Sequence, residues 1–144
     1  MYVKLLFLLS SLTLLGQEKI TYEDHVKDIF RNNCASCHKP SKQKGGLDLM
    51  TYSALIKGSS SGVVLEPGNV DSVLVECISW LDEDTRMPPK DAKLSNADIG
   101  TIKKWILGGL LEKKTSKKLV KQNTVAEFKL PQAPAGSIIM PENL

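Results

Sequence analysis

The sequence predicts a small all-α domain. Of its 144 residues, 42% are hydrophobic and 24% are charged, which is the ordinary range for a single soluble globular domain. Apolar residues recur at helical spacing in four segments, and no segment keeps the strict alternation of a β-strand. Two of these segments follow a Thr or Ser with Asp three residues later, a signature of helix starts. We therefore expect four helices joined by polar loops.

Local signals define the ends of the predicted helices. Thr21, Thr51 and Ser95 are expected to cap the first, second and last helices, and Gly58 and Gly108 are expected to follow the ends of the second and the last. A glycine after a helix is favoured because the chain often turns there with a positive φ. The four helices are predicted at residues 22–33, 52–57, 70–81 and 96–107.

Loops rich in helix breakers separate these helices. Residues 39–46 are polar and contain Pro40 and two glycines, so they are expected to turn at the surface. Residues 86–90 read Arg-Met-Pro-Pro-Lys. Two adjacent prolines remove two amide donors and force an extended conformation on the residue before them, so a stiff loop is expected here.

The first 16 residues have the layout of a signal peptide. Lys4 precedes an apolar run that is too short to span a bilayer comfortably, and Gly16 offers a small residue for cleavage. Leu14 occupies a position where a small residue is preferred, which leaves an uncleaved tether as an alternative. We expect a periplasmic or otherwise exported domain without a stable membrane span. Without residues 1–16 the net charge falls from +3 to +2, which indicates neither a nucleic-acid nor a membrane partner.

Residues 34–38 read Cys-Ala-Ser-Cys-His. The spacing puts the Cys34 and Cys37 thiols and the His38 imidazole on one side of a turn. Haem c needs this combination, because each thiol adds across one vinyl group and the imidazole lies beneath the iron as the proximal ligand. The small residues between the cysteines leave room for a porphyrin edge. The sequence therefore predicts one covalent haem c per chain.

Two other uses of the cysteines are alternatives to haem attachment. A structural zinc site would need four ligands, which Cys34, Cys37 and Cys77 with His25 or His38 would supply, but a second close pair of ligands is missing. A thiol–disulfide oxidoreductase would need a fold of strands and helices, and no strand pattern is visible. A disulfide scaffold would leave one of the three cysteines unpaired. Haem is the favoured interpretation.

The second axial ligand is predicted to be Met87. Met50 and His25 are the other candidates, but Met50 is expected in the core beside apolar neighbours and His25 on a solvated helix surface. The prolines after Met87 hold its loop stiff, so its thioether can be presented at low entropic cost. A soft, neutral sulfur ligand favours ferrous iron and raises the reduction potential. The predicted metal ligands are therefore His38 and Met87.

Three further residues and a cluster of lysines are candidates for functional roles. Trp80 and Trp105 each carry an indole N–H that can bind a haem propionate, but Trp105 is equally expected to pack the first helix against the last. Cys77 lies in an apolar helical stripe, so we expect it to be a buried, inert thiol. The lysines at 113–121 are expected to be solvated surface, with a docking patch for a redox partner as the alternative.

Five motifs in this order resemble the planctomycete-type cytochrome c domain, a class I-like c-type cytochrome. They are residues 34–38, the Gln-Lys-Gly-Gly-Leu-Asp-Leu segment at 43–49, the Pro-Gly turn at 67–68, residues 86–90, and Leu94-Ser95 leading to Trp105-Ile106. The resemblance covers residues 20–111. It implies crossing N- and C-terminal helices around the haem, with Cys34 and Cys37 as attachment sites, His38 as the proximal ligand and Met87 as the distal ligand.

The resemblance also implies a domain organisation. Such domains are commonly fused to a larger partner, so residues 112–144 are interpreted as a linker or tail leading to a C-terminal domain that this chain lacks. We expect an electron carrier, not an enzyme, with an unidentified redox partner, because no catalytic constellation is visible. One alternative is a haem-based small-molecule sensor or haem enzyme module with a displaceable distal ligand. Another is a zinc-stabilised interaction module.

Overall fold

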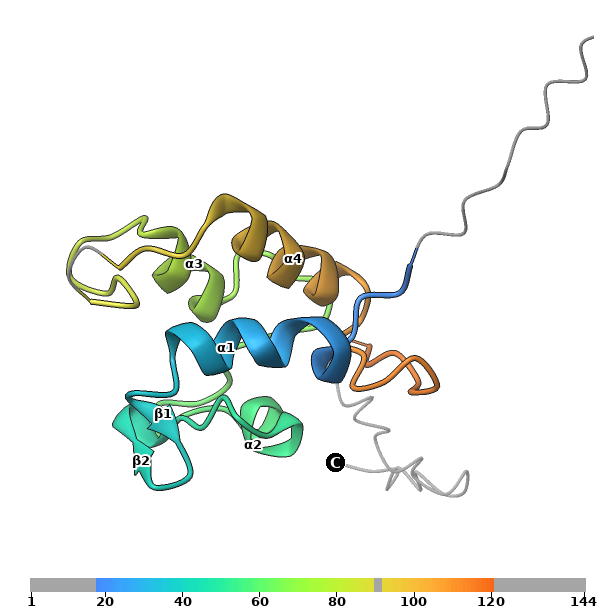
Figure 1. Cartoon of the computed structure of the whole chain (residues 1–144), viewed down its shortest axis with the longest axis horizontal. Coiled ribbons are helices and arrows are strands. Elements are labelled where there is room, and N and C mark those ends of the chain that lie inside the picture. The colour runs from blue at the N-terminus through green and yellow to red at the C-terminus, as the bar shows by residue number, and fades with distance from the viewer. Residues whose placement is uncertain (1–17, 90–91, 121–144) are drawn as a thin grey trace, which may run out of the picture.

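Helices form most of the regular structure in residues 18–89 and 92–120, the part of the chain described by this computed structural model (Figure 1). The prediction of a mostly helical domain is confirmed at this level. None of the described helices is long and apolar enough to cross a membrane. In chain order the elements are η1 (Tyr22–Val26), α1 (Lys27–Asn33), β1 (His38–Lys39), β2 (Lys42–Gln43), η2 (Lys44–Gly46), α2 (Tyr52–Lys57), α3 (Val73–Ser79) and α4 (Asn96–Leu107).

The first helical segment begins at the predicted capping residue. Thr21 Oγ1 accepts a hydrogen bond from the Asp24 amide at 3.2 Å and donates one to Asp24 Oδ2 at 3.0 Å. From there η1 and α1 together cover Tyr22–Asn33, the predicted range, with a wider π-type turn at the start. The amide of Tyr22 donates to the carbonyl of Leu111 at 2.8 Å, which ties the start of this segment to the chain beyond α4.

The helix α3 is shorter than predicted at both ends. The expected range was 70–81, but Asn69 Oδ1 accepts a hydrogen bond from the Asp71 amide at 3.0 Å and holds a turn there. Ser72 therefore becomes the N-cap. At the other end Trp80 adopts a left-handed conformation with φ 59° and ψ 42°, which ends the helix. Both ends were missed because apolar spacing continues past them.

The other two helices match their predicted bounds. In α4, Ser95 Oγ accepts a hydrogen bond from the Asp98 amide at 3.1 Å, so the predicted cap is present. The cap of α2 is only partly as predicted: Thr51 is the N-cap residue but makes no side-chain capping bond, whereas Gly58 ends the helix with φ 92°.

A short antiparallel pair of strands corrects the expectation of a structure without strands. His38 pairs with Gln43 and Lys39 with Lys42, within the segment predicted to be a surface turn. Two residues per strand are too few for an alternating pattern to be visible in the sequence. The pair matters for the site because β1 begins at His38.

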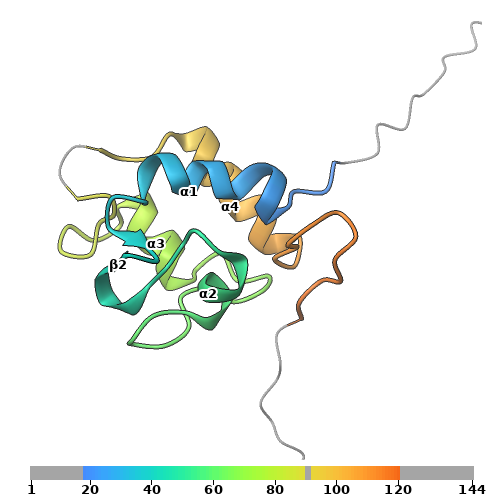
Figure 2. The same cartoon turned by 60° about the horizontal axis from the view of Figure 1, so that its bottom comes forward.

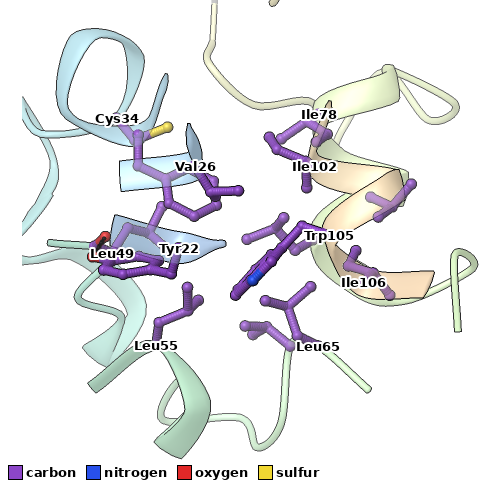
Figure 3. Packing of buried hydrophobic residues seen from close by; sticks show 14 of the residues in the cluster. Tyr22, Val26, Cys34, Leu49, Leu55, Leu65, Ile78, Ile102, Trp105 and Ile106 are labelled. Atoms are coloured by element: carbon purple, nitrogen blue, oxygen red, sulfur yellow. Dashed lines mark hydrogen bonds between the residues drawn. The ribbon is translucent and has the colours of Figure 1, made fainter. Parts of the chain in front are cut away.

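The core lies where η1, α2 and α4 meet. Figure 3 shows the fully buried Trp105 indole pointing from α4 toward Tyr22 and Leu55. The Trp105 and Tyr22 ring centroids are 6.1 Å apart, and Trp105 Nε1 donates to the Leu111 carbonyl at 2.8 Å. Packing of the first helical segment against α4 agrees with the structural role expected for Trp105 (Figure 2).

Candidate haem site

The two thiols and the imidazole of the predicted motif come from one turn at the end of α1. Cys34 is the C-cap of α1, and its carbonyl accepts hydrogen bonds from the amides of Cys37 at 3.1 Å and His38 at 2.9 Å. Cys34 is buried, whereas Cys37 is half-buried, and both are free thiols. The turn therefore presents two thiols that are not joined in a disulfide, next to an imidazole.

The His38 ring is oriented by a backbone carbonyl. Its Nδ1 lies 3.3 Å from the Leu47 carbonyl oxygen. A carbonyl only accepts, so this contact places the proton on Nδ1 and leaves the Nε2 lone pair free for a metal. Metal-binding histidines commonly have such a second partner, which fixes the tautomer and the ring orientation. The Leu49 amide also donates to the His38 carbonyl at 3.1 Å, so the residue is held at two points.

Two adjoining cavities bring the four predicted site residues together. The larger has a volume of about 270 Å³ and is open to solvent, and the smaller has about 70 Å³. Cys34, His38 and Met87 border both cavities, and Cys37 borders the smaller one. The larger cavity also has apolar walls, among them Phe30, Leu47, Leu49, Leu74 and Ile78.

The main chain of Met87 is tied to the end of α3. Its amide donates to the Cys77 carbonyl at 2.9 Å, and its carbonyl accepts from Trp80 Nε1 at 3.0 Å. The peptide bond between Met87 and Pro88 is cis. The Trp80 indole thus has the Met87 backbone carbonyl as its hydrogen-bond partner, which the sequence did not indicate.

The structure corrects the expectation of a buried Cys77. This thiol is half-buried and borders the larger cavity together with His38 and Met87. Burial and, secondarily, the negative charge of Glu76 raise its pKa, so it is a neutral thiol at neutral pH. Helical spacing correctly predicted that Cys77 lies on the inner face of α3. At this position, however, the inner face borders the larger cavity and not the packed core.

Burial also affects the first cysteine of the motif. It raises the pKa of Cys34 to about 11, since the thiolate would lose its hydration in these surroundings. A thiol that stays protonated is a weak nucleophile and resists oxidation. Cys34 is therefore a weak nucleophile in the folded chain at neutral pH.

The other two candidate ligands lie away from the cavities. Met50 packs against the hydrophobic core, as expected. His25 is half-buried and not solvated as predicted: its Nδ1 accepts from the Thr21 amide at 3.2 Å, and its Nε2 is 3.7 Å from Glu18 Oε1. Neither residue borders either cavity. The described ranges also contain no group of three His, Cys, Asp or Glu side chains suited to a metal ion, so they lend no support to a zinc site.

Lys44 is a residue of the site that sequence reasoning missed. It borders both cavities, and its amide donates to the Cys37 carbonyl at 3.0 Å. In the sequence it is only one residue of the Gln-Lys-Gly-Gly segment. Nothing in its spacing from Cys37 shows that the chain folds back across the hairpin.

The donor set fits a covalently attached haem. Two thiols, an imidazole with a free Nε2 and a thioether border the two adjoining cavities, whose walls are mainly apolar. Soft sulfur and imidazole donors are those that hold haem iron in c-type cytochromes. A helix-rich domain with this site is of the c-type cytochrome class.

Comparison with known families agrees with this class. Residues 34–91 match the family model described as Planctomycete cytochrome C. This match confirms the resemblance stated from the sequence for residues 34–91. Comparisons with curated proteins and with solved structures give no match.

Proposed function

We propose that this domain is a monohaem c-type cytochrome that transfers single electrons outside the cytoplasm. The observation that carries the proposal is the arrangement of Cys34, Cys37, His38 and Met87 around two adjoining cavities, although they belong to a turn after α1 and a loop after α3. Cytochrome c domains are typically exported proteins. The domain would act as an electron carrier between a donor and an acceptor, and not as an enzyme.

Each of the four residues has a separate role in holding the group. The Cys34 and Cys37 thiols would each add across one vinyl group, with the sulfur bonded to one carbon and the thiol hydrogen transferred to the other, so that nothing is released. His38 Nε2 and Met87 Sδ would be the two axial ligands. Bound iron would supply one-electron chemistry by changing between its ferric and ferrous states.

The walls of the larger cavity would tune this chemistry. Leu49, Leu74 and Ile78 are buried and give the space an apolar wall. A low dielectric and a thioether ligand both favour the less charged ferrous state and raise the reduction potential. The opening to solvent would leave one edge of a flat ligand accessible to a redox partner.

Expression together with an export and haem-attachment system tests the proposal. The mass of the denatured chain should exceed that of the polypeptide by one haem. A Cys34→Ser/Cys37→Ser variant should lose this added mass, whereas the Cys77→Ser control keeps it, because both attachment thiols remain. A colourless protein, matured under conditions that load known c-type cytochromes, would disprove the proposal.

A haem-based sensor or haem enzyme module is the second candidate, and one observation favours it. Residues 81–85 of the loop that carries Met87 are exposed, so this loop can open at low free-energy cost and release the thioether. Carbon monoxide distinguishes the two. Immediate binding to the reduced protein would support the sensor or enzyme, and resistance would support the carrier. Replacing Met87 by Ala should abolish the sulfur-to-iron charge-transfer band of the ferric protein.

A further inference from the structure

The Met87 loop has little buried surface to hold it. Residues 81–85 of this loop are exposed. Loops with few buried contacts open at low free-energy cost. A ligand on such a loop stays in place only if specific contacts restrain it.

Both backbone polar groups of Met87 are restrained by the last turn of α3. The amide donates to the Cys77 carbonyl at 2.9 Å, and the carbonyl accepts from Trp80 Nε1 at 3.0 Å. The first bond uses only main-chain atoms, which every residue supplies. The second depends on the indole N–H, so it is the one that a side-chain substitution at Trp80 removes.

Trp80 is itself held in a fixed orientation. Its left-handed backbone conformation ends α3, and its amide donates to the Cys77 carbonyl at 3.3 Å. The Arg86 guanidinium carbon lies 5.3 Å and Lys93 Nζ lies 5.9 Å from the centroid of its ring. Both distances are within the range of a cation–π interaction. These contacts therefore restrain the indole independently of its hydrogen bond to the Met87 carbonyl.

We propose that Trp80 is a positioning residue that holds Met87 at the cavity through its indole N–H. The inference rests on the proposed function, in which Met87 Sδ is the distal ligand. When the indole hydrogen bond is lost, the loop opens more readily and an external ligand replaces Met87 more easily. The thioether itself is unchanged, so Trp80 acts only through Met87.

The test uses the haem-loaded full chain and imidazole as the competing ligand. Trp80→Phe keeps an aromatic ring beside Arg86 but removes the N–H donor. We expect a roughly two- to tenfold lower apparent Kd for imidazole, the factor that corresponds to one lost hydrogen bond. The sulfur-to-iron band should weaken in parallel. Leu81→Ala is the matched control, because its side chain is next in the chain and 76% exposed.

Measuring Trp80→Phe both in the wild-type protein and in the Met87→Ala protein distinguishes a positioning role of Trp80 from a general structural effect. In Met87→Ala protein, Trp80→Phe should leave imidazole affinity unchanged, since no thioether remains to be displaced. An equal change in both backgrounds, or no change relative to the wild type, would overturn the inference.

If Trp80→Phe does not fold, Arg86→Gln replaces it as the test. This variant keeps the indole but removes the Arg86 cation–π contact that restrains it, and should lower the apparent Kd for imidazole roughly two- to fivefold. An unchanged Kd in Arg86→Gln would then overturn the inference.

The same experiment shows which proposal has failed. A wild-type protein that has covalent haem but no sulfur-to-iron band would overturn Met87 as ligand, and the role of Trp80 with it. A normal wild-type band that persists unweakened in Trp80→Phe, with unaltered imidazole affinity, would overturn only the role of Trp80.

Discussion

The His38 imidazole and the Leu47 carbonyl lie 3.3 Å apart, although the two residues are nine positions apart in the chain. The position of that carbonyl depends on the turn that follows it. The buried Asp48 side chain accepts a hydrogen bond from the Met50 amide at 2.8 Å and another from Thr51 Oγ1 at 3.4 Å. Asp48 therefore holds the segment that orients the predicted proximal ligand.

Replacing Asp48 by Ala should lower the free energy of unfolding by about 1–3 kcal/mol, because the Met50 amide loses its acceptor. Asp48→Asn keeps an oxygen acceptor and should cost less than half as much. Urea unfolding of the purified chain measures both values. Equal losses in the two variants would contradict the role given to this hydrogen bond.

Two adjacent glycines should respond differently to the same substitution. Both have positive φ, 62° at Gly45 and 71° at Gly46. A Cβ at Gly45 meets nothing within 4 Å, whereas one at Gly46 would lie 2.1 Å from Ser60 Oγ and 2.9 Å from the Ser60 backbone nitrogen. Gly45→Ala should cost about 1–2 kcal/mol from backbone strain alone. Gly46→Ala should lower the free energy of unfolding by a similar strain cost plus about 1–3 kcal/mol from overpacking against Ser60.

Thermal and urea unfolding of the two glycine variants, measured side by side, checks this difference. A larger loss for Gly45→Ala than for Gly46→Ala would show that the approach of Ser60 is not tight in solution. Because Lys44 and Leu47 of the same segment border the cavity, Gly46→Ala is also expected to reduce haem loading.

Tyr22 should make stability depend on pH in alkaline solution. Its fully buried hydroxyl donates to the Leu49 carbonyl at 2.9 Å. Burial, with smaller contributions from the charges of Glu23 and Asp48, raises its pKa well above the ordinary value of 10.0. The unfolded chain therefore loses this proton first as the pH rises. The stabilising contribution is fully present below pH 10.0 and falls above it.

Tyr22→Phe isolates this contribution. The variant should be less stable by about 1–3 kcal/mol at neutral pH, since the Leu49 carbonyl loses its partner. Its stability should fall less steeply than that of the wild type above pH 10.0. Urea unfolding at a series of pH values checks both statements, and parallel curves for the two proteins would contradict the assignment to Tyr22.

Trp105 should be the most costly core residue to truncate. It is fully buried, and its indole N–H donates to the Leu111 carbonyl, so Trp105→Ala should cost about 3–5 kcal/mol. Leu107, two residues further along α4, is 61% exposed, and Leu107→Ala should change stability by no more than about 0.5 kcal/mol. Comparable losses in the two variants would show that the core does not centre on Trp105.

Local sequence signals predicted several elements well. The first helical segment, α2 and α4 have the expected bounds, and Thr21 and Ser95 cap as expected. Capping and apolar spacing act within about one turn, so they can be read from neighbouring residues. The ends of α3 could not be predicted in this way. An Asx-type turn at Asn69 and the left-handed conformation of Trp80 end the helix, although the helical spacing of apolar residues continues past both points.

The sequence alone determined the chemistry that the chain carries: two thiols and an imidazole in one turn, and a methionine before two prolines. Only the tertiary structure decided which of these groups share a cavity, that Cys77 faces it too, and that Trp80 binds the Met87 carbonyl. The physical reason is distance along the chain. A side chain's partners and exposure depend on elements that pack against it from remote segments, and spacing within one segment does not specify them.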